Sequence, residues 1–196
     1  MFRGAGMRAR DKIKLTIIKY LKENPADQLT IKTLLMEANV SKQSLYNNFY
    51  GIQDAVCESV CDLFDEAAEE YFGQEDWMTG MKEVLRMLNE RRDIMMHLWN
   101  SKWRYEILNA LSDHVYPIIL NGLDECEERT GITVSREDKK VVAGLYQDIV
   151  MGLFMRYMRD RMEQDPEDLI GVYEAILEKD TSHGFSRISA IRKNSR

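Results

Sequence analysis

Short polar side chains are concentrated in the segment Ser-Lys-Gln-Ser-Leu-Tyr-Asn-Asn-Phe at residues 41–49. Lys42, Gln43 and Ser44 bring a cation, an amide and a hydroxyl, which are groups that hydrogen-bond to phosphates and to the edges of bases. The leucine and the phenylalanine of the segment are spaced four apart, so both can anchor one side of a helix on an apolar core. This pattern is typical of a short helix that enters the DNA major groove.

Two capping residues and a turn residue are placed to hold this helix. Thr30 and Ser41 each precede a helical segment, and their hydroxyls can accept the unpaired backbone N–H groups of a first turn. Asn39 falls in the turn between the segments, where a left-handed conformation is needed that asparagine tolerates. The upstream segment has apolar residues at the spacing i, i+3, i+4 and i+7, namely Ile31, Leu34, Leu35 and Ala38. The spacing predicts a helix, a tight turn and a second helix.

The N-terminal residues predict a bracing helix behind a basic arm. Apolar positions from about Asp11 onward mark the helix, which Pro25 should end. Residues 1–10 include Arg3, Arg8 and Arg10, and such an arm either reaches phosphates or a minor groove, or is a frayed terminus.

Helical periodicity continues beyond this region, and no segment reads as a strand, so the sequence predicts an all-α fold of about nine helices. Gly73 to Asp76 is expected to be a loop, and Ser135 with Asp138 resembles a capping box. Pro117 must either kink its helix or begin a second half. The helices expected after residue 51 run from Ile52 to about 71, through 81–88, through 94–99, from about 105 to 128, from about 137 to 163, and from Pro166 to about 179.

The helix expected at 137–163 is apolar around much of its circumference. One side carries Val142, Leu145, Ile149 and Leu153, and another carries Ala143, Tyr146, Val150, Phe154 and Tyr157. Such a helix must bury two surfaces, one on its own core and one on a second subunit. The sequence therefore predicts a homodimer formed through 137–163 and 166–179.

The net charge of −6 is distributed unevenly along the 196 residues. Residues 1–50 have a balance of +5, residues 51–180 a balance of −15, and residues 181–196 a balance of +4. A basic head on an acidic body is expected when only the head binds a polyanion. We predict three parts: an arm and DNA-binding domain at 1–50, a helical effector-binding and dimerisation domain at 51–180, and a disordered basic tail at 181–196.

The remaining residue types point away from catalysis and membranes. The three histidines lack metal or triad spacing, and no phosphate-binding glycine loop or nucleophile motif is present. Cys57 and Cys61 are one helical turn apart and are either a metal or redox pair or simply buried side chains. Neither a signal peptide nor a membrane span is recognisable. We expect a cytoplasmic protein that is not an enzyme and needs no metal or cofactor.

Residues 11–64 resemble the N-terminal domain of the TetR family of transcriptional regulators. The resemblance rests on Thr30 at the head of a helix, on Ala38-Asn39-Val40-Ser41 at the turn, and on Tyr46-Asn47-Asn48-Phe49 at the end of the next helix. Asn39 replaces the usual glycine, Asn48 the usual histidine, and Ile52 a lysine that often holds the DNA backbone.

This resemblance implies DNA-binding roles for individual side chains. Phosphate contacts would come from Thr30, Lys42, Tyr46 and Asn48, while Gln43, Ser44 and Asn47 would face bases behind the capping residue Ser41. Gln43 is either a reader of adenine or a solvated first-turn residue.

The resemblance also implies an effector cavity in the body. Candidate residues are Met96, Trp99, Trp103, Tyr116, Tyr146, Gln147, Asp148, Met151 and Phe154. The apolar candidates are either pocket or plain core, and a buried Asp148 would have to be paired, protonated or bound to a ligand. The function implied is a homodimeric regulator, a repressor of a palindromic operator that a small effector releases; the alternative is the same fold with a protein coregulator.

Overall fold

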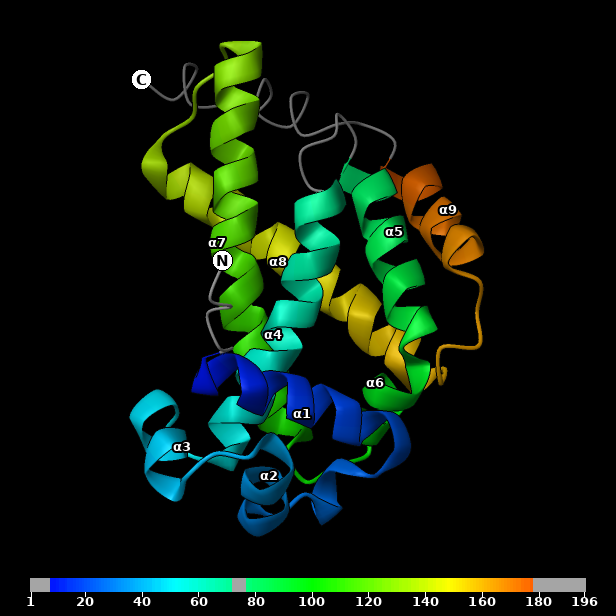
Figure 1. The fold of residues 1–196 in the computed structure, drawn as a ribbon. Coiled ribbons are helices and arrows are strands. Elements are labelled where there is room, and N and C mark those ends of the chain that lie inside the picture. Colours follow the sequence, from blue (N-terminus) through cyan, green and yellow to red (C-terminus); the bar gives the residue numbers. More distant parts are fainter. Residues whose placement is uncertain (1–7, 72–76, 178–196) are drawn as a thin grey trace, which may run out of the picture. The chain divides into compact units, whose positions relative to one another are not determined.

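The computed structural model describes residues 8–71 and 77–177, which form nine α-helices, one 3₁₀ turn and no strand (Figure 1). The helices are α1 (Ala9–Glu23), α2 (Ile31–Ala38), α3 (Lys42–Asn48), α4 (Ile52–Tyr71), α5 (Trp77–Glu90), α6 (Arg92–Trp99), α7 (Arg104–Thr130), α8 (Arg136–Arg159) and α9 (Pro166–Leu177), with the 3₁₀ turn η1 at Ala26–Gln28. The all-α prediction is confirmed. The expected loop at 73–76, most of the N-terminal arm and the basic tail lie outside the described residues.

The helices belong to two compact units. The first unit consists of residues up to Glu66 together with Leu88–Leu111, and the second of Ala67–Met87 together with the residues from Ser112 onward. Helices α4, α5 and α7 each contribute to both units. The predicted domain boundaries at 50 and 180 remain predictions, because a packing unit and a functional domain are different divisions of a chain.

The first unit is built around α1. Its residues Ile13, Ile17 and Leu21 are completely buried, at 0% exposure each, as the apolar spacing predicts. Helices α2, α3 and α6 pack against it. Two hydrogen bonds join the region of α6 to this core: His97 Nδ1 lies 2.8 Å from the carbonyl oxygen of Leu21, and the Lys102 N–H donates to Asp27 over 2.9 Å.

In the second unit, the hairpin of α7 and α8 is held by apolar packing and a polar cluster at its closed end. The apolar packing centres on two buried residues, Leu123 and Ala143. Glu127 accepts hydrogen bonds from the Val134 N–H over 2.9 Å and from Lys139 over 2.5 Å. Burial alone would raise the pKa of Glu127, but these two bonds outweigh it and hold the pKa below its ordinary value. The stabilisation from this lowered pKa is present at neutral pH and is lost as the pH falls.

Within the chain from α7 to α9, the C-terminal end of α8 differs from the sequence-based expectation. Helix α8 ends at Arg159 and does not reach about 163, so that predicted boundary is wrong. Arg161 and Met162 both have left-handed φ values, 57° and 58°, and the Met162 N–H bonds to the Tyr157 carbonyl over 2.9 Å, which closes the helix end. Pro117 lies inside α7 and does not begin a separate helix.

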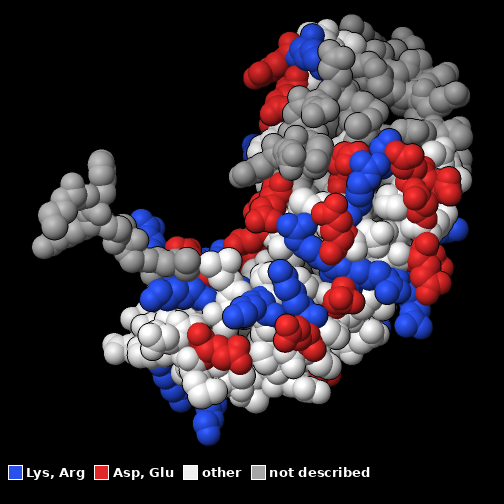
Figure 2. Space-filling view, turned by 45° about the vertical axis from the view of Figure 1, so that its right-hand side comes forward, with Lys and Arg blue, Asp and Glu red and all other residues white. Residues whose placement is uncertain are grey.

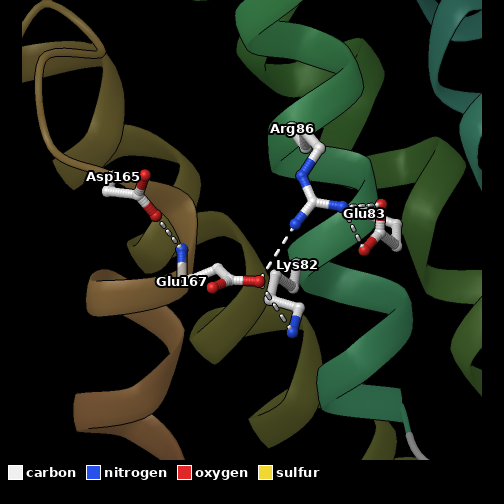
Figure 3. A network of polar contacts seen from close by, with 5 residues as sticks. All are labelled: Lys82, Glu83, Arg86, Asp165 and Glu167. Carbon is white, nitrogen blue, oxygen red and sulfur yellow. Dashed lines mark hydrogen bonds and ion pairs between the residues drawn. The ribbon is translucent and has the colours of Figure 1, made fainter.

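The start of α9 is fixed by a cap and by ion pairs to α5. The Glu167 N–H donates to the Asp165 carboxylate over 2.7 Å, as expected for an Asp-Pro helix start. Glu167 in turn lies 3.4 Å from Lys82 and 3.1 Å from Arg86, which also bonds to Glu83 over 2.7 Å (Figure 3). Because these side chains are solvent-accessible, each pair stabilises the fold only slightly, and their shared geometry mainly orients α9.

Candidate nucleic-acid interface

The turn between α2 and α3 has the predicted geometry. Thr30 caps α2, since its hydroxyl accepts the Thr33 N–H over 3.1 Å. Asn39 is left-handed, with φ 50° and ψ 52°, and the Val40 N–H then bonds back to the Leu35 carbonyl over 3.2 Å. The left-handed residue lets the chain leave α2 and start α3 after only a few residues.

Helix α3 has exposed polar side chains on one side and a buried apolar residue on the other. Ser41 caps it, because the Ser44 N–H donates to its hydroxyl over 3.1 Å. Leu45 is 0% exposed and fixes the back of the helix to the first unit. Lys42 and Gln43 are exposed, as groove-facing side chains must be. A helix of two turns gains little stability from its own hydrogen bonds, so the cap and the buried leucine determine its position.

The other DNA-binding candidates lie on the same two helices or at their caps. Tyr46 is 48% exposed and its ring lies 5.9 Å from the Lys42 ammonium. Asn47 is exposed, whereas Asn48 is half-buried and donates from Nδ2 to the Ser44 carbonyl over 2.7 Å. The Asn48 amide has a second N–H beyond the one bonded to Ser44, which is the donor that its predicted phosphate contact requires.

Arg10 has a role that the sequence reasoning missed. Its guanidinium donates to the Asn48 carbonyl over 3.3 Å, lies 5.1 Å from the centre of the Phe49 ring, and pairs with Glu58 on α4. Arg10 therefore belongs to α1 and joins the end of α3 to α4. A signal existed, because Arg10 precedes Ile13 by three residues and falls on the buried side of α1.

The sequence analysis also did not predict the hydrogen bond that holds the connection from α3 to α4. The Asp54 carboxylate accepts the backbone N–H of Tyr50 over 2.9 Å, in the manner of a reversed helix cap. The Tyr50 side chain is 98% exposed. An acid in the first turn of the helix beginning at Ile52 was the available signal for the cap.

Charge on the visible face is mixed. Figure 2 shows Lys and Arg side chains interspersed with Asp and Glu, with no broad single-sign patch. Where charges are mixed in this way, attraction to a polyanion comes from individually placed cations and from neutral hydrogen-bond donors.

Two of the three effector candidates in the first unit make cation–aromatic contacts. Trp103 is buried and lies under the Lys102 ammonium at 5.1 Å from the ring centre. Trp99 is half-buried and lies under the Arg104 guanidinium, also at 5.1 Å. Met96 is half-buried on the same helix as Trp99.

The effector candidates of the second unit have varied surroundings. Tyr116 and Tyr146 both pack against the cluster of Leu123 and Ala143, which favours the plain-core interpretation for these two. Gln147 donates to the Ser112 carbonyl over 2.7 Å, so its amide joins α8 to α7. Phe154 is buried and Met151 is half-buried, both on α8.

Asp148 requires a correction. Its position in the most apolar helix suggested a buried acid, but the side chain is exposed. The physical reason is that α8 leaves one side uncovered within a single chain, and Val141 and Leu145 on that side are also exposed, at 63% and 58%.

The cysteines of α4 are packed into the first unit. Cys61 is buried, and its thiol lies 3.9 Å from the Ala110 carbonyl. Burial raises its pKa to about 12. Burial, followed by the nearby carboxylates Asp54 and Glu106, raises the pKa of Cys57 to about 11. Within the described residues, no group of three or more His, Cys, Asp or Glu side chains gathers as a metal site.

These pKa values predict slow thiol alkylation. At neutral pH, Cys57 should react with iodoacetamide roughly 100-fold more slowly than an ordinary thiol, because the thiolate is the nucleophile and two pKa units separate the two groups. The rate should keep rising through pH 10. Mass-spectrometric alkylation kinetics across pH, with denatured protein as the control, would measure this; a plateau near pH 8.5 would contradict it.

None of the described helices combines the length and the apolar character needed to cross a lipid bilayer.

Comparison with known proteins defines the class. Residues 75–179 match the family model described as the transcriptional regulator C-terminal region of TetR type. This match covers more than half of the chain, and a helix-turn-helix precedes it. The class is therefore that of helix-turn-helix transcriptional regulators. Within it, the chain belongs to the TetR family.

Solved structures share the fold at low sequence identity. A protein described as a transcriptional regulator of Rhodococcus sp. RHA1 superposes with a TM-score of 0.56 at 14% identity, covering 88% of this chain and 97% of that one. The fatty acid degradation regulator FadR of Bacillus halodurans gives 0.53 at 14% identity, covering 90% and 96%. A regulator of Pseudomonas aeruginosa PAO1 gives 0.53 at 12% identity, covering 91% and 93%. No curated protein sequence is significantly similar to the chain.

Proposed function

We propose that this TetR-family protein is a homodimeric repressor that binds a palindromic operator and is released by an effector bound to its helical body. The observation that carries the proposal is α3, a capped helix with a buried Leu45 behind and exposed Lys42 and Gln43 in front. Such a helix supplies a cation for phosphate and an amide for base edges in its first turn.

Selection from a pool of random DNA duplexes tests the DNA-binding proposal. A dimer with two copies of α3 should enrich an inverted repeat whose half-sites are separated by about 34 Å or a larger body-determined distance. Failure to enrich any inverted repeat at moderate salt would contradict the proposal.

Substitutions of two neighbouring residues should separate contacts to the DNA phosphates from contacts to the bases. Lys42→Ala should weaken binding to all sequences and lower the salt slope by about one for each lost ion contact, because the ammonium displaces a counterion. Gln43→Ala should relax preference at one base position, at a cost of roughly 1–3 kcal/mol for the preferred base. Anisotropy titrations over salt and single-base operator variants measure both; the opposite pattern would reverse the assignments.

The proposed dimer interface is the uncovered side of α8 together with α9. Val141 and Leu145 on α8 and Val172 on α9 are all more than half exposed in the single chain. At Gly144 and Gly152 an added Cβ would meet no atom within 4 Å, so this side of α8 is open. Because these glycines have no side chain, a second helix could approach the α8 backbone closely. In the dimer, Asp148 would face the partner, where an arginine can pair with it.

Release from the operator requires a second conformer of the dimer. An effector acts by binding more tightly to a conformer with the wrong spacing between recognition helices. The candidates with the least support as pocket residues are Tyr116 and Tyr146, which are engaged in core packing. This packing favours the alternative of a protein coregulator bound to the acidic body.

Thermal shift and DNA release measured against small apolar molecules would separate these possibilities. A compound that both raises the melting temperature and weakens operator binding supports a small effector. A defined protein that changes operator affinity, with no active compound, supports the coregulator.

A further inference from the structure

The α3–α4 elbow, defined here as residues 48–54, has an immobilised backbone. At its start, Arg10 holds the Asn48 carbonyl over 3.3 Å. Phe49 is extended, with φ −144° and ψ 149°, and its side chain is only 3% exposed. At its other end, Asp54 holds the backbone N–H of Tyr50 over 2.9 Å. The elbow is therefore fixed on both sides of Tyr50.

On this fixed backbone, the side chain of Tyr50 is 98% exposed. Single exposed apolar side chains are common on proteins, so exposure alone identifies no function. What distinguishes Tyr50 is its position two residues beyond Asn48, at the end of the recognition helix. Two extended residues span at most about 7 Å, which places the Tyr50 backbone beside the groups that face DNA.

The chemistry of the side chain suits one particular target. A phenol hydroxyl donates a hydrogen bond to a phosphate oxygen without bringing a charge. The nearest described acid on the elbow, Asp54, is already engaged with the Tyr50 N–H, so its carboxylate lies at the backbone and at the positive end of α4. Because the ring is exposed, a phosphate can reach its hydroxyl.

We propose that Tyr50 is a neutral DNA-backbone contact, whose hydroxyl donates a hydrogen bond to an operator phosphate next to those contacted by α3. The inference rests on the proposed DNA-binding function and adds to it a contact outside the recognition helix. In this arrangement, Arg10 and Asp54 are positioning residues that hold the elbow, and Tyr50 is the contact itself.

The test removes only the hydroxyl. Tyr50→Phe should weaken binding to the selected operator by roughly tenfold, because each protomer of the dimer loses one hydrogen bond to an anion. The salt slope should stay unchanged, since no cation is removed. Tyr105→Phe is the matched control: Tyr105 is 72% exposed, belongs to the same unit and lies on α7, outside the elbow. Both variants should keep the wild-type melting temperature.

Fluorescence anisotropy at several salt concentrations distinguishes the outcomes. Wild-type affinity in Tyr50→Phe, with the wild-type protein binding its operator normally, would overturn this inference and leave the proposed function intact. A decrease in the salt slope would also overturn the assignment of a neutral contact. If the wild-type protein bound no operator, both this inference and the proposed function would fall.

Discussion

Replacing Leu145 with arginine should convert the proposed dimer into monomers and lower operator affinity by roughly 100-fold or more. Leu145 is 58% exposed on the open side of α8, beside Val141. In a two-fold interface the same patch meets itself, so every substitution is present twice. Two unpaired guanidinium groups would have to be buried there, which costs far more than the lost leucine contacts. Each monomer would then bind only one half-site.

Light scattering coupled to size exclusion gives the oligomeric state, and anisotropy gives the affinity. Leu15→Arg is the matched control, because Leu15 is 57% exposed on α1, in the first unit, and lies on none of the proposed interface helices. It should remain dimeric. A Leu145→Arg protein that stays dimeric at micromolar concentration would show that another surface forms the interface.

Truncation of Leu45 to alanine should destabilise the first unit by about 2–5 kcal/mol and abolish operator binding. Leu45 is completely buried and is the only buried residue within α3 among those described. Its loss leaves a cavity beneath a helix that has two turns and cannot remain folded without tertiary contacts. Local unfolding of α3 would displace the exposed Lys42 and Gln43 and would break the hydrogen bond from Arg10 to the Asn48 carbonyl.

Chemical denaturation measures the free energy of unfolding, and hydrogen exchange at α3 amides shows whether the loss is local. The control is the same substitution at an exposed site, Leu15→Ala, which should change stability by less than about 0.5 kcal/mol. If Leu45→Ala retained wild-type protection at α3 and wild-type DNA affinity, the anchoring role of Leu45 would be wrong.

The features predicted correctly from sequence are those set by local chemistry. Thr30, Asn39 and Ser41 were assigned as two caps and a left-handed turn residue, and the structure confirms each of them. A cap depends on a hydroxyl and a few following residues, and a left-handed turn depends on one residue type. The apolar spacing of α1 likewise needed only the helical period.

The features that sequence reasoning missed depend on contacts between distant segments. Arg10 meets Asn48 and Glu58, which lie 38 and 48 residues away along the chain. Asp148 was judged by the apolar character of its helix, but its exposure depends on which side of α8 its neighbours cover. The end of α8 was placed too late because two left-handed non-glycine residues, Arg161 and Met162, have no local signal.

The helices shared by the two units limit how the specificity of this regulator can be transferred. Residue 50 looks like a natural junction for a chimera with a relative, yet a cut there would separate Arg10 from Glu58 and Leu21 from His97. A chimera would therefore have to supply both halves of a unit that is discontinuous in sequence. Grafting a few surface side chains of α3 and the elbow onto a relative's own scaffold is the smaller change, and it keeps every buried partner with the chain in which it evolved.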